Sequence, residues 1–473
     1  MQPAKKVLII MFNEDICSKI ILPFCPGYDR KRQIFNRSIQ KYPSAIVYCE
    51  NVQEVKEAVR YAVSRRMEIR VRSGGHNYEG FCIGNKRLVI DTSLLKDKSI
   101  CEDTQTVRIG SGVNNRELYH FLSQYGYPFP SGTCPTVKAV GLTQGGGWGH
   151  SSRMFGLTCD LLAEAELVDP KGNVIVANER EHSDLFWALR GGGGGNFGVI
   201  TSLTYHLLPK VTKVTYVDIQ YSEINDETAL QFLRAWQKWV QKKENRFTPN
   251  SRIFNSQKEG MGIFLRGFFY GTPEEATASV KPFLKICGAK ASFRYVTFLE
   301  ATEIDASVYP PFEKFRFAGR FVCGSYSIRQ IEAIIRMVKK RARGSTYASV
   351  ALYALGGKVR DMAPCDTAFY YRKANYIMGI ETIWKVPEAQ PENLSWIYSR
   401  FRCLSSLTVG SYINFPYLCT ANYMKAYYGG NAKRLMCIKD KYDPCNLFRF
   451  AQSIKPCHAS RISKWDKDSN RYK

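Results

Sequence analysis

The sequence has no long apolar run and no recognisable export signal. None of its apolar stretches approaches the roughly 18–20 residues that a helix needs to span a bilayer. The apolar part of Lys5–Phe12 follows a basic start, but it is too short for a signal peptide, and no small-residue cleavage site comes after it. We therefore expect a cytoplasmic protein without a membrane partner.

Paired cysteines and clustered histidines are also missing. The 15 cysteines show no C-x-x-C spacing, and the six histidines lie too far apart in sequence to predict a zinc site. Without an export signal, we expect no bound metal and mostly free, buried thiols. Cys134 is treated separately below, because it lies in a glycine-rich segment.

Acidic residues are scarce relative to basic ones. The chain has 67 Lys and Arg against 42 Asp and Glu, a net charge of +25, which raises nucleic acids and anionic substrates as partners. The basic residues are scattered, however. Lys339–Arg343 is the one dense run, and no zinc-finger, helix-turn-helix or RNP motif is present. Scattered, solvated side chains explain the charge better, so we expect no nucleic acid partner.

The length of 473 residues is too great for one compact core, so we expect more than one domain. The first predicted region is residues 1–208. Here a strand over 45–49, a helical stripe over 52–64 and a strand over 67–71 predict a β-α-β unit with parallel strands. Glycine clusters are concentrated in the same region.

The pattern of glycines and predicted elements changes twice after this region. Residues 209–410 alternate longer strands and helices, which favours a substrate domain with helices laid on one face of a sheet. In residues 411–473 the polar, glycine-rich character returns, and we expect the last fifteen residues to be loose.

The segment Arg72–Gly80 directly follows a predicted strand. Its paired glycines, Gly74 and Gly75, allow backbone N–H groups to turn inward and form a nest that suits phosphate oxygens. Arg72 is expected to add a fixed guanidinium fork beside this nest, and His76 lies where the loop ends. A plain strand-to-turn junction with a surface histidine is the alternative.

Two further segments are rich in glycine. Gly132–Gly149 has six glycines in eighteen residues, too many for a stable helix or strand interior, which suggests that it wraps around a nucleotide-like cofactor. Arg190–Gly198 contains a literal G-x-G-x-x-G. A predicted helix precedes it and a strand follows it, the reverse of the dinucleotide-binding order, so we reject a Rossmann fold.

Five motifs together resemble the berberine-bridge-enzyme-like FAD-linked oxidases of the vanillyl-alcohol-oxidase (PCMH-type) superfamily. They are Arg72–His76, Gly132–Gly149, Arg190–Gly198, Tyr412–Asn414 and Tyr442–Phe448, and the similarity runs from about residue 25 to residue 457. The resemblance implies an α+β fold. A PCMH-type FAD-binding domain of two α/β subdomains is rejoined by the C-terminal segment after a substrate domain with a large antiparallel sheet flanked by helices.

The resemblance also implies how FAD is held. In many members a histidine binds ring carbon 8α of the flavin and a cysteine binds ring carbon 6, and His76 and Cys134 stand at these positions, although Cys134 could also be a buried thiol in a turn. The other cofactor-binding residues implied by the family are Arg72, Ser73, Gly74, Gly75, Asn77, Gly132, Thr133, Gly141, Gly145, Gly146, Gly198, Val199, Ile200 and Asn414.

Two tyrosines are candidates for catalysis. Tyr412 matches the tyrosine base of carbohydrate-oxidising relatives, which places Asn414 near the flavin ring. Because the pKa of tyrosine is about 10, positive charge must lower it before the side chain can act as a base near neutral pH. Tyr353, found by counting back from Gly356-Gly357, matches the position of a second, assisting group. Either tyrosine could instead be a packing residue.

The sequence departs from the family pattern at two places. Lys138–Val140 replaces a small, glycine-containing stretch that lies near the oxygen-accessible face of the flavin in relatives, and Tyr417 stands where the family often has Asp. The first departure leaves open whether oxygen or another molecule accepts the electrons.

Three functions are compatible with these motifs. The first is an oxidase that converts an alcohol, a sugar or a glycosylated natural product to a ketone or lactone and passes the electrons to O2, giving H2O2. The second is a dehydrogenase on the same scaffold with a non-oxygen acceptor, and the third is a non-enzymatic basic binding protein. The combination of His76, Cys134 and Tyr412 favours an enzyme, which we expect to be a monomer or homodimer.

Overall fold

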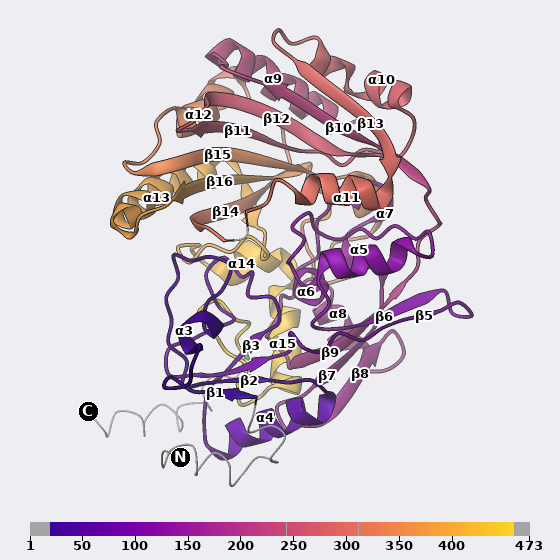
Figure 1. Ribbon diagram of the computed structural model, residues 1–473, viewed down its shortest axis with the longest axis vertical. Coiled ribbons are helices and arrows are strands. Elements are labelled where there is room, and N and C mark those ends of the chain that lie inside the picture. The colour runs from indigo at the N-terminus through magenta and orange to yellow at the C-terminus, as the bar shows by residue number, and fades with distance from the viewer. Residues whose placement is uncertain (1–18, 243, 311, 458–473) are drawn as a thin grey trace.

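Three β-sheets organise the protein in a computed structural model that describes residues 19–242, 244–310 and 312–457 (Figure 1). The two smaller sheets lie in the lower part of Figure 1 and the largest one in the upper part. The predictions for Lys5–Phe12 and for the last fifteen residues concern segments that lie outside the described residues.

The first sheet has four strands and a parallel centre. Its order is β1 (Ile20–Ile21), β2 (Ala45–Tyr48), β4 (Leu88–Asp91) and β3 (Ile69–Arg72), and both β2 and β3 run parallel to β4. Helix α4 (Val52–Ser64) begins after Asn51, whose side chain accepts the N–H of Glu54. The stripe predicted from the sequence is buried: Val55, Ala58, Val59 and Ala62. The predicted β-α-β unit is confirmed, with β4 inserted between its two strands.

The second sheet has five antiparallel strands. Its order is β5 (Lys98–Cys101), β6 (Thr106–Gly110), β9 (Val199–His206), β7 (Leu162–Val168) and β8 (Val174–Asn178). Helices α5 (Asn115–Ser123) and α8 (Ser183–Leu189) contribute to its core. Because α8 precedes the glycine run 190–198 and β9 follows it, the rejection of a Rossmann motif is confirmed.

The third sheet has eight antiparallel strands. Its order is β13 (Lys290–Thr297), β10 (Lys213–Tyr221), β12 (Gly260–Phe269), β11 (Asn250–Ser256), β15 (Ser345–Ala354), β16 (Tyr376–Trp384), β14 (Lys314–Val322) and β17 (Val409–Ser411). Four helices cover its outer face (Figure 1): α9 (Asp226–Trp239), α10 (Pro273–Leu284), α12 (Ile328–Lys339) and α13 (Gln390–Leu407). The opposite face turns toward the two smaller sheets. The predicted α+β fold with a large, helix-flanked antiparallel sheet is therefore confirmed.

A buried arginine joins the sheets across the middle of the molecule. Arg153, in the short helix α7 (Ser152–Phe155), donates from its guanidinium to the carbonyl oxygens of Val240, Lys242 and Glu244, just beyond the end of α9. Cations suit the carbonyl-rich end of a helix, so this contact fixes α7 to the substrate-side layer. Helix α11 (Phe298–Ala306) contacts α5 from the same side, where Arg116 and Glu303 form an ion pair.

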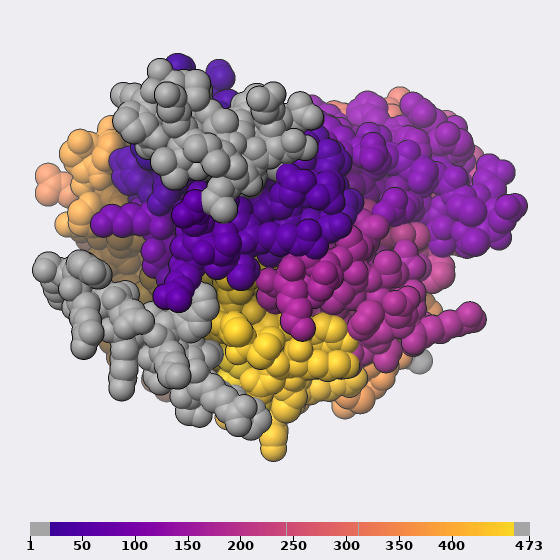
Figure 2. All heavy atoms as spheres, turned by 90° about the horizontal axis from the view of Figure 1, so that it is seen from below, coloured from indigo at the N-terminus to yellow at the C-terminus, as the bar shows by residue number. Residues whose placement is uncertain are grey.

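The C-terminal segment returns to the smaller sheets through α14 (Tyr423–Tyr428) and α15 (Ala432–Tyr442), drawn in yellow in Figure 1. Seen from below in Figure 2, this yellow segment lies beside the indigo and magenta parts of the chain. Lys439 of α15 is fully buried, with its ammonium 2.6 Å from the carboxylate of Asp443. The same ammonium donates to the carbonyl oxygens of Asn196 and Phe448. Since Asn196 belongs to the third glycine segment, this lysine fastens the end of the chain to that loop.

Two predictions about local structure are wrong. The segment Gly132–Gly149 contains a helical turn, α6 (Ala139–Gln144), which is possible because its one glycine follows the buried apolar residues Ala139 and Val140. Most described cysteines are not buried either: Cys49 and Cys159 are, but eight of the fourteen are exposed, and none of the fourteen forms a disulfide. None of the described helices combines the length and apolarity that crossing a membrane requires.

Candidate functional site

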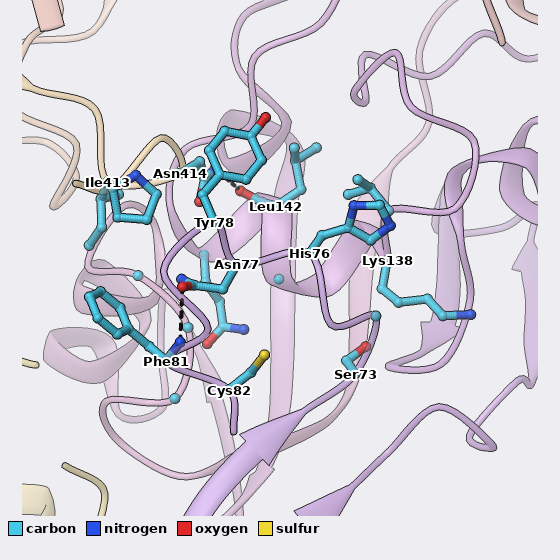
Figure 3. Close-up of a pocket in the computed structure, with 18 of the residues that line it drawn as sticks. Ser73, His76, Asn77, Tyr78, Phe81, Cys82, Lys138, Leu142, Ile413 and Asn414 are labelled. Atoms are coloured by element: carbon cyan, nitrogen blue, oxygen red, sulfur yellow. Dashed lines mark hydrogen bonds between the residues drawn. The ribbon is translucent and has the colours of Figure 1, made fainter. Parts of the chain in front are cut away.

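A deep cavity lies where the glycine segments meet the inner face of the eight-stranded sheet (Figure 3). Its empty volume, open mouth included, is about 1840 Å³. Residues from the amino-terminal region, from the large sheet and from the C-terminal segment all line it. The predicted site residues among them are Ser73, Gly74, Gly75, His76, Asn77, Gly132, Thr133, Cys134, Gly141, Gly198, Ile200, Tyr353, Tyr412 and Asn414.

Arg72 does not present its guanidinium to this cavity, contrary to the expected fork beside the nest. The side chain is buried and forms an ion pair with Asp91 of the neighbouring strand β4. It also donates to the carbonyl oxygen of Lys31 and to the hydroxyl of Tyr48. Arg72 therefore holds β3 against its surroundings, because its fork is already occupied by protein acceptors.

Three other predicted residues also lie outside the lining. A Cβ on Gly145 would come within 2.1 Å of the Asn414 amide, and one on Gly146 within 2.7 Å of the Phe369 ring. These glycines therefore permit close packing behind the cavity wall. Val199 is fully buried in the core of the first sheet.

His76 and Cys134 approach each other through one hydroxyl group. The Nε2 atom of His76 lies 2.9 Å from Oγ1 of Thr136, and Sγ of Cys134 lies 3.6 Å from the same oxygen. Burial lowers the pKa of His76 to about 3, with a further contribution from the ammonium of Lys138. His76 is therefore neutral near pH 7, whereas burial raises the pKa of the Cys134 thiol.

Some glycines keep the cavity open rather than permit close packing. A Cβ on Gly141 would meet nothing within 4 Å, and one on Gly195 would meet its nearest neighbours only at 3.9 Å, although both positions line the cavity. Gly195 also has φ +72°, a conformation that favours glycine. Side chains at these positions would fill a cradle built from backbone, which is what a cofactor with a pyrophosphate needs.

The hydroxyl of Tyr412 is enclosed by hydrogen-bond donors. The backbone N–H groups of Gly147 and Trp148 each donate to it at 3.2 Å, and Nδ2 of Asn414 donates at 3.0 Å. Burial raises the pKa of Tyr412 to about 12, and these three donors oppose that shift because they stabilise the phenolate. Asn414 also donates to the carbonyl oxygen of Leu142, which fixes the amide between α6 and the tyrosine.

Tyr353 has a different environment, because a cation lies beside it. Nη1 of Arg252 donates to the Tyr353 hydroxyl at 3.1 Å, and Nε of the same arginine lies 3.7 Å from the carboxylate of Glu381. Burial raises the pKa of Tyr353, and Arg252 acts in the opposite direction. All three side chains project from the inner face of the large sheet, on β11, β15 and β16.

Several lining residues were not predicted from the sequence. Phe415 packs between the two tyrosines, with ring centroids 5.1 Å from Tyr353 and 5.0 Å from Tyr412. Its place directly after the Tyr-x-Asn motif could have indicated it. Arg252 alternates with the core residue Ile253 on β11, a weaker signal, and no local pattern points to Phe450 or Gln452.

Comparison with known proteins decides the family. The description "FAD binding domain" matches residues 43–178, and "Berberine and berberine like" matches residues 411–455. The chain is 35% identical over 456 residues to "Uncharacterized FAD-linked oxidoreductase YgaK" of Bacillus subtilis, which covers 95% of this chain and 99% of that protein. The chain belongs to the berberine-bridge-enzyme-like family of FAD-linked oxidoreductases.

Other members of the family are similar over nearly the whole chain. A "Carbohydrate oxidase" of Microdochium nivale is 27% identical over 471 residues, covering 92% of each protein. The solved structure of a "Chitooligosaccharide oxidase" superposes with a TM-score of 0.84 at 25% identity and covers 92% of this chain and 97% of that one. Physcomitrella patens BBE-like 1 gives a TM-score of 0.85 at 25% identity, with coverages of 93% and 97%.

The family identifies the cofactor of the cavity as FAD. The backbone cradle at Gly141 and Gly195, the lining glycines Gly74 and Gly75, and the neutral His76 fit such a molecule. The enzyme is therefore an FAD-linked oxidoreductase. Aromatic side chains, among them Tyr353 of the large sheet and Phe415, form one wall of its cofactor cavity.

Proposed function

We propose that this enzyme oxidises a hydroxyl group of a small sugar, alcohol or glycosylated natural product, and that O2 then takes the electrons, giving H2O2. The observation that carries the proposal is the donor-enclosed phenol of Tyr412 at the wall of the cofactor cavity, with Tyr353 nearby. Two relatives named for carbohydrate and chitooligosaccharide oxidation support a substrate of this class.

Oxidation of an alcohol removes a proton from oxygen and a hydride from carbon. FAD, when bound, supplies the hydride acceptor. Tyr412 takes the hydroxyl proton in its deprotonated form, which is a small fraction near neutral pH because burial raises its pKa to about 12. The N–H groups of Gly147 and Trp148, rather than the positive charge expected from the sequence, stabilise this phenolate. Tyr353 assists by hydrogen-bonding the substrate hydroxyl and sharing its proton, while Arg252 keeps a positive charge beside it.

His76 and Cys134 are proposed to attach the flavin covalently, at ring carbons 8α and 6. Their convergence on Thr136 and the neutral state of His76 support this assignment, because a nucleophile must carry a free lone pair. Two links would fix the ring in a cavity with an open mouth.

Acid precipitation tests the attachment. Yellow colour is expected to stay with the precipitated wild-type protein and with the His76→Ala and Cys134→Ala variants, and to enter the supernatant only from the double variant. Release of the colour from wild type would contradict both covalent links without affecting the assignment of FAD.

The chemistry is tested by anaerobic reduction with a panel of sugars and secondary alcohols, followed by admission of oxygen. Bleaching of the flavin and one H2O2 per substrate are expected, and Tyr412→Phe should slow bleaching by about 10²–10⁴-fold while the flavin spectrum is retained. Tyr398→Phe, which removes the hydroxyl of an exposed tyrosine on the outer helix α13, serves as a matched control and is expected to leave bleaching unchanged. Bleaching without peroxide would indicate a non-oxygen acceptor, and no bleaching by any alcohol would contradict the proposal.

A further inference from the structure

A second cavity adjoins the cofactor cavity, and cationic side chains dominate its wall. Its empty volume, mouth included, is about 1060 Å³. Lys41, Arg70, Arg87 and Arg316 line it, and Glu79 contributes its one carboxylate. These residues come from the amino-terminal lead-in, the first sheet and strand β14 of the large sheet, so segments that are remote in sequence build this basic cavity together.

Two of the four cations of the basic cavity, Lys41 and Arg316, are held in place by neutral acceptors. Nζ of Lys41 donates to the carbonyl oxygens of Glu79 and Gly80, at 3.3 and 2.7 Å. Nη1 of Arg316 donates to Oγ of Ser38 and to the carbonyl oxygen of Phe315. Within the described part of the chain, no carboxylate forms an ion pair with either cation, and neutral acceptors do not balance a charge.

One carboxylate serves the two remaining arginines. Oε2 of Glu68 lies 2.6 Å from Nε of Arg87 and 3.5 Å from Nη2 of Arg70, while its other oxygen pairs with Arg449 at 3.0 Å. Glu79 is the second carboxylate near these cations: burial raises its pKa, whereas the charges of Arg316 and Lys41 and the N–H of Leu418 act in the opposite direction. Two carboxylates, Glu68 and Glu79, thus face the four cations of the cavity and Arg449. Positive charge therefore exceeds negative charge at this wall.

Two aromatic rings lie between the basic cavity and the cofactor cavity. Phe81 and Phe450 stack with ring centroids 5.2 Å apart and an interplanar angle of 22°, and both rings line both cavities. Figure 3 shows Phe81 from the cofactor side. An occupant of the basic cavity would meet guanidinium donors on one side and these rings on the other.

We propose that the basic cavity binds an organic phosphate, as a ligand separate from FAD. Guanidinium forks match phosphate oxygens, and the uncompensated cations suit a dianion better than a monoanion. The stacked phenylalanines provide a surface for an apolar or aromatic body. Because the ligand would bridge the first sheet and β14, it would join the cofactor-binding and substrate-side layers.

Calorimetric titration of the FAD-loaded protein with phenyl phosphate, at constant ionic strength, tests the proposal. We expect saturable binding of one molecule per chain, weakened at least tenfold in Arg316→Gln and, as a second variant, in Lys41→Gln. Arg343→Gln removes one charge from an exposed position outside the cavity and is expected to leave binding unchanged. Benzoate, a monoanion with the same ring, is expected to bind more weakly than phenyl phosphate.

Four outcomes would overturn the proposal. These are the absence of saturable binding, an equal loss in Arg343→Gln, benzoate binding as tight as that of phenyl phosphate, and binding to FAD-free protein only. The last would show that the cavity is an extension of the cofactor site. None of them depends on whether the enzyme oxidises alcohols.

Discussion

The two buried tyrosines at the cavity wall differ in the groups that bind their hydroxyls. Among the described residues, the three donors to the Tyr412 hydroxyl are all uncharged, whereas Tyr353 is hydrogen-bonded to the cation of Arg252. Both phenols are buried, and burial raises the pKa of each. The pKa of Tyr353 is therefore the one that a single charge-removing substitution can shift.

The Arg252→Met variant is expected to move the pH profile of kcat/KM to higher pH by about one unit. A tyrosine that must be deprotonated gains activity as pH rises toward its pKa, and loss of the neighbouring cation raises that pKa. Profiles of wild type, Arg252→Met and the charge-conserving Arg252→Lys, measured between pH 6 and 10, check this. Identical pH profiles for wild type and Arg252→Met would show that Tyr353 does not share the proton of the substrate hydroxyl.

The sequence could predict which loops build the site but not the direction of every side chain. His76, Cys134 and Tyr412 lie at the cavity because each belongs to a motif whose backbone course is fixed by glycines or by packing. Arg72 belongs to such a motif too, yet its guanidinium binds Asp91. Its partner lies on a neighbouring strand, and strand pairing is not visible in a local pattern.

At the scale of helices and strands, local sequence patterns predicted some elements, and tertiary packing determined the others. Helix α4 was predictable because its apolar stripe and its Asn51 cap agree. Helix α6 was not, because a glycine in a six-residue helix argues against it, and only burial of Ala139 and Val140 compensates. The pairing of β11 with β15, which brings Arg252 to Tyr353, depends on strands about one hundred residues apart.

Helix α15 and the segment that follows it carry a pair of thiols in close approach. Sγ of Cys437 and Sγ of Cys457 lie 3.8 Å apart, and both residues are exposed. Treatment with diamide is expected to oxidise the two thiols to a disulfide, the azo reagent being reduced to the hydrazine. The closed loop should stabilise the protein by roughly 3 kcal/mol.

Peptide mapping and thermal unfolding before and after reduction check this prediction. The Cys437→Ser variant should lose the cross-linked peptide and the difference in Tm. Cys445→Ser, which removes another exposed cysteine from the same loop, should keep both. A cross-link that survives in Cys437→Ser would contradict the assignment of the pair.

At the scale of the whole molecule, the C-terminal return is held by a buried ion pair. Lys439 and Asp443 are both fully buried, and Lys439 also binds the carbonyl oxygen of Asn196 in the third glycine segment. The Lys439→Met variant leaves the charge of Asp443 uncompensated and is expected to lower the free energy of unfolding by about 3–5 kcal/mol.

Urea unfolding of Lys439→Met and of Lys441→Met, two residues apart on α15, gives a matched comparison. Lys441 also pairs with a carboxylate, that of Asp184, but at a side chain that is 59% exposed. Its loss should cost at most about 1 kcal/mol. Equal destabilisation of the two variants would show that the buried pair has no special role in the C-terminal return.

The folding of the C-terminal segment back onto the glycine segments limits when the cofactor can be enclosed during protein synthesis. Gly147, in the second glycine segment, meets Tyr412, which is translated 265 residues later. A chain is made from its amino terminus, so a ribosome-bound intermediate can display all three glycine segments while the opposite wall does not yet exist. The flavin can be enclosed between both walls only after the segment that carries Tyr412 has been made and has folded back, so cofactor enclosure follows the synthesis of that segment.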